Sequence, residues 1–138
     1  MDLWNNEIVS HSLSSKRGDR MTYISGLKEL LELKKQYPEY QMILHSDQGS
    51  VYASKAYNDL LPMYVTRSMS RAGTPTDNGA MESINGWIKA ELFMDFHVTG
   101  DRPVETEIDE YITFFNEQRP AYALNYLTPK QYRETYAP

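Results

Sequence analysis

The sequence predicts an α/β domain in which helices flank a mixed β-sheet. Short apolar or β-branched runs alternate with longer amphipathic segments in the first half of the chain, and helical patterns alone fill the second half. A chain of 138 residues can bury roughly 70% of its unfolded surface around one core. We therefore expect residues 1–138 to form a single domain.

The first half opens with a predicted strand, a helix and a second strand. The segment NEIVSHSLS at 6–14 alternates loosely between apolar and polar residues, which indicates a strand. Apolar residues then recur at three-to-four spacing from Met21 to about Gln36, which predicts an amphipathic helix that Pro38 terminates. The apolar run YQMILHS at 40–46 lies between turn signals and is short, which favours a strand.

A second helix and strand follow. Ser54 can cap a helix that runs through Leu61, where Pro62 ends it. The β-branched residues of YVTRSM at 64–69 predict another strand. The next segment, SRAGTPTDNG, is dense in turn-forming residues and is expected to be a loop.

Three helices are predicted in the second half. Thr76 or Asp77 can cap a helix that ends near Phe93, and Pro103 suits the first turn of the next one. A threonine followed by proline predicts a short last helix at 128–136. The expected apolar faces of the first two are Ala80, Ile84, Trp87 and Ile88, and Val104, Ile108, Tyr111, Ile112 and Phe115.

The composition restricts the classes of partner and compartment. A net charge of −5 and a pI near 5.2 argue against a large phosphate-binding surface, although the basic segments 15–20 and 66–71 can contact phosphate locally. The chain has no cysteine, which excludes disulfides and thiolate metal sites and fits a reducing compartment. No apolar run approaches the ~18 residues of a membrane helix, and the N-terminus lacks a signal-peptide pattern. We expect a cytoplasmic protein.

Two carboxylates occupy positions that are typical of a catalytic site. Asp47 follows the strand at 40–46, at the kind of edge where open α/β sheets bind ligands, and Glu82 lies one turn into a helix. Converging carboxylates repel by about 4 kcal/mol at ~4 Å and an effective dielectric of ~20, and Mg²⁺ removes that penalty. Each residue also has a simpler interpretation: Asp47 as a turn residue that bonds its own backbone, and Glu82 as a partner of the helix dipole.

Three segments in order resemble a known family. They are HSDQGSVYAS, SMSRAGTPTDNGAMESINGWIKAEL and FFNEQRPAYALNYLTPKQYRE. Together they resemble the integrase-type (DDE) catalytic domain of bacterial insertion-sequence transposases, a family related to retroviral integrases with a ribonuclease H-like fold. The resemblance covers nearly the whole chain, beginning with DLWNNEIVSHSLS, which is similar to the family's second hairpin. It implies cleavage and transfer of DNA strands with Mg²⁺ or Mn²⁺ as cofactor.

The resemblance also implies roles for individual residues. Asp47 matches the family's second catalytic aspartate and Glu82 its glutamate, with one residue fewer between them than is usual. Lys89, two helical turns beyond Glu82, matches a lysine that meets DNA near the scissile end. The other predicted DNA contacts are Arg71 in the basic segment 66–71, Asn78 in the DN pair beside the site, and Tyr52, which is close enough to Asp47 to stack on a base or sugar.

The family's first aspartate lies in a motif resembling Trp-x-x-Asp-x-Thr, which these 138 residues do not contain. The upstream helix-turn-helix region is also absent. We therefore expect an N-terminally truncated core that lacks the first strand and depends on the missing aspartate for activity. Its expected partners are the element's ends and target DNA, together with a second copy or full-length transposase at the unpaired edge of the strand 40–46. The alternative is a non-catalytic remnant that binds DNA or full-length transposase and so modulates transposition.

Overall fold

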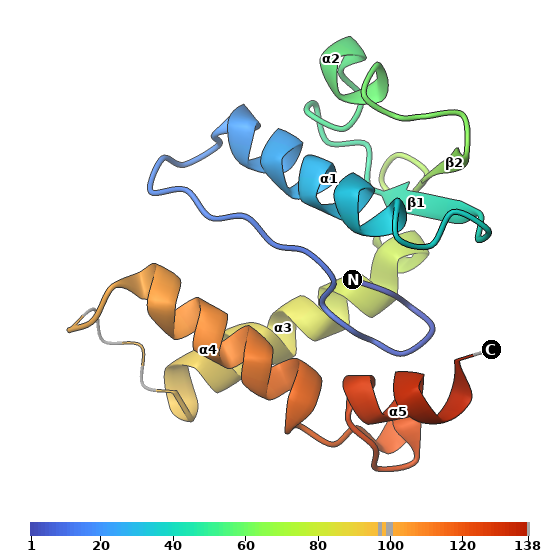
Figure 1. The fold of residues 1–138 in the computed structure, drawn as a ribbon. Helices are drawn as coiled ribbons and strands as arrows, with labels where there is room; N and C mark the ends of the chain where they lie inside the picture. The colour runs from blue at the N-terminus through green and yellow to red at the C-terminus, as the bar shows by residue number, and fades with distance from the viewer. Residues whose placement is uncertain (97, 99–100, 138) are drawn as a thin grey trace. The chain divides into compact units, whose positions relative to one another are not determined.

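The structure, a computed structural model, describes residues 1–96, 98 and 101–137, which form two compact units. The sheet unit, Ser10–Glu82, contains both strands and the first two helices. The helical unit consists of Met1–Val9 together with Ser83–Pro138. Figure 1 shows the elements of each unit. Within the described residues, no helix has the length and apolar character that a membrane span requires.

Two parallel strands make up the sheet in the described part of the chain, and both were predicted. β1 (Met42–Ser46) and β2 (Val65–Met69) pair in register, with Ser46 opposite Met69. The ladder extends one step further, because the Ser70 N–H donates to the Ser46 carbonyl at 2.9 Å. Parallel pairing brings the carboxyl ends of both strands to one edge of the sheet.

The predicted first helix is confirmed as α1 (Arg20–Lys34). Asp19 caps it, since its carboxylate accepts the N–H of Met21 at 3.0 Å. At the other end the Lys34 ammonium lies 5.4 Å from the centre of the Tyr64 ring, next to β2. The contact between Lys34 and Tyr64 joins the end of α1 to the start of β2, and α1 lies beside the strand pair (Figure 1).

The second helix, α2 (Lys55–Asn58), begins at the predicted Ser54 cap but is shorter than predicted. It ends at Asn58 and not at Leu61. The Asn58 side-chain amide donates to the carbonyls of Tyr52 and Ser54 at 2.9 and 2.8 Å, and the Leu61 N–H bonds back to the Asn58 carbonyl at 3.1 Å. Side-chain bonds and a tighter turn thus replace further helical turns.

The three predicted helices of the second half are confirmed as α3 (Gly79–Met94), α4 (Val104–Glu117) and α5 (Pro129–Tyr136) (Figure 1). Thr128 caps α5 through a capping box with Gln131, as the Thr-Pro pair indicated. Short 3₁₀ turns at Pro75–Asn78 and Tyr122–Leu124 precede α3 and α5, respectively.

The predicted cap of α3 at Thr76 or Asp77 is wrong. Both residues lie inside the 3₁₀ turn, which leads directly into α3. The Asp77 carboxylate accepts hydrogen bonds from the backbone and guanidinium of Arg71 instead. The Arg71 guanidinium binds both oxygens of the carboxylate with two nitrogens, which a single capping bond to a backbone N–H does not offer.

The predicted strand at 6–14 is also wrong, because no residue of this segment pairs with a strand. The Ile8 N–H donates to Asn116 Oδ1 at 2.9 Å, and Asn116 Nδ2 donates to the Ile8 carbonyl at 3.0 Å. A single amide side chain from α4 therefore satisfies both backbone groups that a neighbouring strand would otherwise bind.

The core of the helical unit is built from α3 and α4. Ile84, Tyr111 and Phe115 are at most 5% exposed and pack with Ile88 and Ile112, as the predicted apolar faces require. Three other predicted members of these faces, Ala80, Trp87 and Val104, are exposed. The Trp87 ring is partly covered all the same, because the Arg119 guanidinium lies 5.8 Å from its centre.

Candidate active site at the edge of the sheet unit

Asp47 directly follows β1, and its side chain is exposed. Its Oδ1 accepts the N–H of Gly49 at 2.8 Å, which closes a turn onto its own backbone. A Cβ atom on Gly49 would lie only 2.9 Å from that oxygen and 3.4 Å from Tyr52 Cδ2. A side chain at position 49 would therefore displace this carboxylate oxygen, so the turn as it stands uses one oxygen of Asp47 and the small size of Gly49.

Glu82 lies in the first turn of α3, and its side chain is exposed. This part of α3 belongs to the sheet unit. The chain reaches Glu82 from the end of β2 through residues 70–78, whereas Asp47 leaves the end of β1. Because the two strands are parallel, the chain segments that lead to Asp47 and to Glu82 leave the sheet at the same edge.

A polar network ties this edge together. The His45 ring contacts the hydroxyls of Ser68 and Ser70 at 2.9 and 3.1 Å. Gln48 Nε2 donates to the Ser70 carbonyl at 3.0 Å, so the turn after β1 is bonded to the start of the segment that leads to α3. His45 therefore has a structural place between two serine hydroxyls of the neighbouring chain segment.

Arg71 and Asp77 form an ion pair within the 70–78 segment. Arg71 Nε and Nη2 bind the two oxygens of Asp77, each at 2.9 Å, and the Arg71 side chain is 78% exposed. The Arg71 guanidinium and backbone N–H hold the pKa of the Asp77 carboxyl below its usual value. Arg71, a predicted DNA contact, thus already has a carboxylate partner. Asn78, at the end of the same 3₁₀ turn, is half-buried.

Tyr52 and Lys89, also predicted DNA contacts, have different surroundings. The Tyr52 ring packs edge-on against Tyr23 and Tyr57, with ring centres 5.4 and 5.3 Å apart. Burial is the main cause that raises the pKa of Tyr52 to about 12, and the nearby Asp47 charge adds to it. Lys89 is exposed on α3, in the part that belongs to the helical unit.

Arg67 is a residue that the sequence analysis missed. It lies on β2, two residues after the buried Val65 and so on the same face, and its guanidinium lies 5.3 Å from the Tyr57 ring and 6.0 Å from the Tyr52 ring. The sequence feature that could have identified Arg67 is a charged residue at a position of the predicted strand that faces the interior. Charged residues are seldom buried without a partner.

The donor set of this edge suits a hard divalent cation. Carboxylate oxygens with retained water are the ligands that Mg²⁺ prefers, and Asp47 and Glu82 supply two carboxylates. Among the described residues, no group of three or more His, Cys, Asp or Glu side chains is arranged to hold a metal ion. Two carboxylates alone would leave most positions around such a cation to other oxygen ligands.

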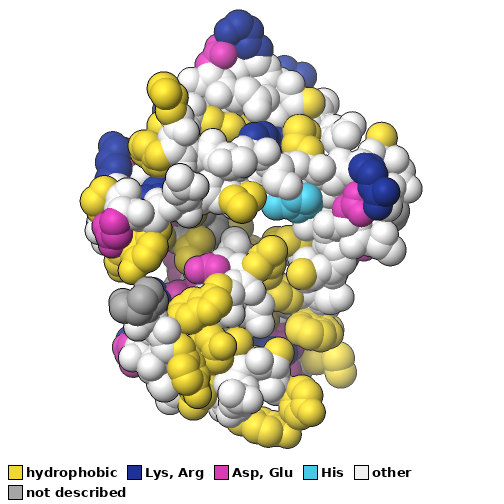
Figure 2. Space-filling view, turned by 90° about the vertical axis from the view of Figure 1, so that its right-hand side faces the viewer, with side chains coloured by type: hydrophobic (Ala, Val, Ile, Leu, Met, Phe, Trp, Pro, Cys, Tyr) yellow, Lys and Arg dark blue, Asp and Glu magenta, His cyan; other side chains and the backbone are white. Residues whose placement is uncertain are grey.

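Positive charge is scattered on the face that Figure 2 shows. Lysine and arginine side chains stand apart there, in several cases beside an acidic side chain, and form no continuous stripe. The composition predicted this, since the chain carries 14 Lys and Arg against 19 Asp and Glu. Contacts with phosphate on this face would have to be local.

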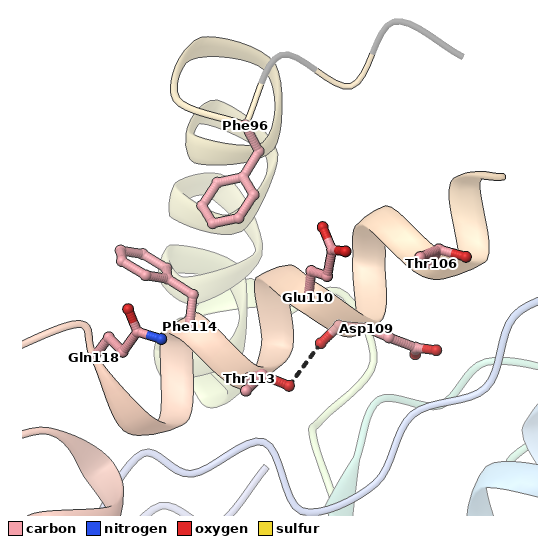
Figure 3. Close-up of a pocket in the computed structure, with 7 residues that line it drawn as sticks. All are labelled: Phe96, Thr106, Asp109, Glu110, Thr113, Phe114 and Gln118. Atoms are coloured by element: carbon pink, nitrogen blue, oxygen red, sulfur yellow. Dashed lines mark hydrogen bonds between the residues drawn. The ribbon is translucent and has the colours of Figure 1, made fainter. Parts of the chain in front are cut away.

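The helical unit has a cavity of about 470 Å³ of a different character (Figure 3). Phe96 and Phe114 form an apolar wall with ring centres 5.1 Å apart, and α4 supplies the carboxylates of Asp109 and Glu110. Glu110 is paired with Arg102 at 2.6 Å. The remaining lining residues are Thr106, Thr113 and Gln118. Apolar and acidic walls do not suit a phosphate group.

Comparison with known proteins identifies the family. Residues 63–129 match the family model described as integrase core domain. The chain is 34% identical to the putative transposase InsK for insertion sequence element IS150 of Escherichia coli K12, over all of this chain and 48% of that protein. It is 35% identical to the transposase for insertion sequence element IS904 of Lactococcus lactis, over 97% of this chain and 53% of that protein. The chain thus spans about half the length of these relatives.

Solved structures show the fold. A chain of the simian T-cell lymphotropic virus intasome, in complex with the PP2A regulatory subunit B56 gamma, matches 89% of this chain and 43% of its own length, with a TM-score of 0.71 and 19% identity. The HTLV-2 integrase catalytic core domain, in complex with magnesium, matches 78% of this chain and 67% of its own length, with a TM-score of 0.57 and 16% identity. The predicted ribonuclease H-like fold is confirmed. The chain belongs to the integrase core family of insertion-sequence transposases.

Proposed function

We propose that this chain acts in DNA transposition, as part of a metal-dependent core that cleaves DNA strands and joins them to a target. The observation that carries the proposal is topological: the segments that lead to Asp47 and Glu82 leave the parallel strand pair at the same edge. That edge is where α/β sheets bind their ligands. The transposase names of the relatives support the same reaction class. In this proposal both units belong to one core domain.

Asp47 and Glu82 are the proposed metal ligands. Asp47 Oδ1 is held by the Gly49 N–H, and within the described residues its second oxygen has no hydrogen bond, so it is available to a cation. The magnesium complex of the HTLV-2 integrase core, which has the same fold, supports the choice of Mg²⁺ or Mn²⁺. When bound, such ions activate the attacking oxygen and stabilise the leaving oxygen of phosphoryl transfer. The role of the two residues is to hold these ions at the edge of the sheet.

The proposed partner is DNA, both at the ends of the element and in the target. Lys89, Arg71, Asn78 and Tyr52 remain the proposed contacts. With a net charge of −5, the chain would bind through a few local contacts, and each cation that meets a phosphate steepens the salt dependence of affinity by about one unit. Arg71 would have to share or exchange its Asp77 partner. Association with a second copy or with full-length transposase is proposed on the intasome likeness.

Titration with Mn²⁺ tests the site directly. We expect the 138-residue chain to bind Mn²⁺ weakly, and Asp47→Asn or Glu82→Gln to abolish that binding. Asp77→Asn is the matched control, because its carboxylate is committed to Arg71 in the same segment. If the Asp47 and Glu82 variants bind Mn²⁺ as the parent does, the site assignment is wrong.

A second candidate is a non-catalytic chain that binds DNA or full-length transposase. It is favoured by one observation: no residue stands in a Trp-x-x-Asp-x-Thr motif, which leaves two of the family's three carboxylates. A strand-joining assay with a pre-cleaved DNA end tests whether two carboxylates are enough for activity. We expect this chain alone to be nearly silent and to retain DNA binding in Asp47→Asn. Robust joining by the chain alone would contradict the need for a third carboxylate.

A further inference from the structure

The guanidinium of Arg67 reaches from β2 to the segment that carries Asp47. Its Nη2 donates to Ser46 Oγ at 2.9 Å and to the Tyr52 carbonyl at 3.2 Å. Ser46 immediately precedes Asp47, and Tyr52 follows it by five residues. A single nitrogen therefore ties both ends of the segment 46–52 to the neighbouring strand.

Ser46 passes this restraint on to Asp47. Its side chain is only 9% exposed, and its hydroxyl donates to the Asp47 carbonyl at 2.7 Å while it accepts from Arg67. The hydroxyl thus has one donor partner and one acceptor partner, both with good distances. The result is a continuous chain of hydrogen bonds from β2 to the backbone of Asp47.

Packing alone does not explain an arginine at this position. Arg67 has the Tyr52 and Tyr57 rings beside it, but within the described residues it has no carboxylate partner. Its Nε and Nη1 are buried and make no hydrogen bond to any described group. Buried donors without acceptors cost stability, and a methionine would fill similar space without that cost. Such departures from good packing are expected where a residue serves a site.

We propose that Arg67 is a positioning residue that holds Asp47 in place for the divalent metal ion. The inference rests on the proposed function, in which Asp47 is a metal ligand. Arg67 fixes the backbone of Asp47 through Ser46 and restrains the chain at Tyr52, whereas Gly49 fixes one carboxylate oxygen. The two restraints together leave the second oxygen in one place. Ligand-orienting partners of this kind typically contribute tenfold or more to metal affinity.

Two variants break the restraint in different ways. Arg67→Met removes the donor, and Ser46→Ala removes the hydroxyl in a much smaller change that keeps the arginine. We expect each to weaken Mn²⁺ binding at least about tenfold, measured by calorimetry on the 138-residue chain. Thr66→Ala is the matched control, since this residue of β2 is exposed and its hydroxyl makes no hydrogen bond to another described group. Its Mn²⁺ affinity should equal that of the parent.

A second readout needs no metal. Backbone ¹⁵N relaxation should give order parameters for residues 47–50 near ~0.85 in the parent and below ~0.6 in Arg67→Met, with β1 itself unchanged. A purely structural role of Arg67 would loosen β1 and β2 as well, which would overturn the proposal.

The outcomes distinguish this inference from the proposed function. If Asp47→Asn abolishes Mn²⁺ binding while Arg67→Met and Ser46→Ala bind as the parent does, Asp47 is a ligand and Arg67 does not position it. If Asp47→Asn leaves Mn²⁺ binding intact, the metal site itself is misassigned. Weaker binding in both variants, with rigid β1 and mobile residues 47–50, supports the role of Arg67.

Discussion

Arg119 in the helical unit and Arg67 in the sheet unit are both partly buried against aromatic rings, but among the described residues only Arg119 has a carboxylate partner. Arg119 lies over Trp87 and Phe115 and binds both oxygens of Glu91, with its Nη2 2.6 Å from Oε1. Glu91 also accepts the Tyr111 hydroxyl at 2.8 Å. Arg67 has two rings beside it but no carboxylate from any residue that the structure describes.

The difference separates two uses of the same side chain. A planar guanidinium that binds a carboxylate with two nitrogens and stacks on rings is a stabilising unit. A guanidinium with two buried, unpaired nitrogens is not explained by stability. The comparison therefore predicts that the same substitution at the two arginines will have different consequences.

The largest effect is expected for Arg119→Met. It leaves Glu91, whose side chain is only 20% exposed, without its cation, which should lower the free energy of unfolding by about 2–4 kcal/mol. Urea unfolding followed by tryptophan fluorescence measures this well, because Trp4 and Trp87 both lie in the helical unit. Lys130→Met is the control: its pair with Glu117 is about half exposed and should contribute under ~1 kcal/mol. Equal losses in the two variants would show that the Glu91 pair has no special weight.

A smaller effect is expected for Tyr111→Phe, which removes the hydroxyl that donates to Glu91 and keeps the buried ring. Loss of a hydrogen bond to a charged acceptor should lower the free energy of unfolding by about 1.5 kcal/mol. Tyr52→Phe is the matched control in the sheet unit. The Tyr52 hydroxyl makes no hydrogen bond to another described group, so its removal should be nearly neutral at neutral pH.

The pH dependence of these two tyrosine variants sharpens the comparison. Burial first, and then the bond to Glu91, raise the pKa of Tyr111 above its usual value of 10.0, and burial raises the pKa of Tyr52 to about 12. The neutral phenol is thus favoured in the folded protein, so this stability is present below pH ~10 and is lost as the pH rises further. The cost of Tyr111→Phe should therefore shrink between pH ~10 and ~12. A cost that grows in this range would contradict the assigned cause.

Much of the fold follows from local sequence signals. The runs 40–46 and 64–69 predicted both strands, and the caps Ser54 and Thr128 predicted where two helices begin. In each case the signal and its partner lie within a few residues of each other. Asp47 illustrates the same point, since its turn bond to Gly49 and its position after a strand are both local.

Two of the failures arose where a partner far along the chain decides the outcome. The segment 6–14 has the alternation of a strand, but Asn116 binds its backbone from more than a hundred residues away. The Asp77 error is local by contrast, because its carboxylate binds Arg71 six residues earlier and does not cap α3. Arg67 was missed because nothing in YVTRSM reveals that its guanidinium reaches both Ser46 and the Tyr52 carbonyl. Long-range pairing of polar groups is not encoded in periodicity.

The smallest effect on stability is expected for Arg67→Met, and it is the decisive one for the comparison. The variant loses two hydrogen bonds but also removes two buried donors that have no acceptor, so the free energy of unfolding should change by less than ~1 kcal/mol. Urea unfolding followed by far-UV circular dichroism reports on the sheet unit, which contains no tryptophan. A loss as large as that of Arg119→Met would make Arg67 a second stabilising arginine, and the unpaired nitrogens would then need another explanation. A near-neutral result, with weaker Mn²⁺ binding in the same variant, would mean that this arginine serves the position of Asp47 and not the stability of the fold.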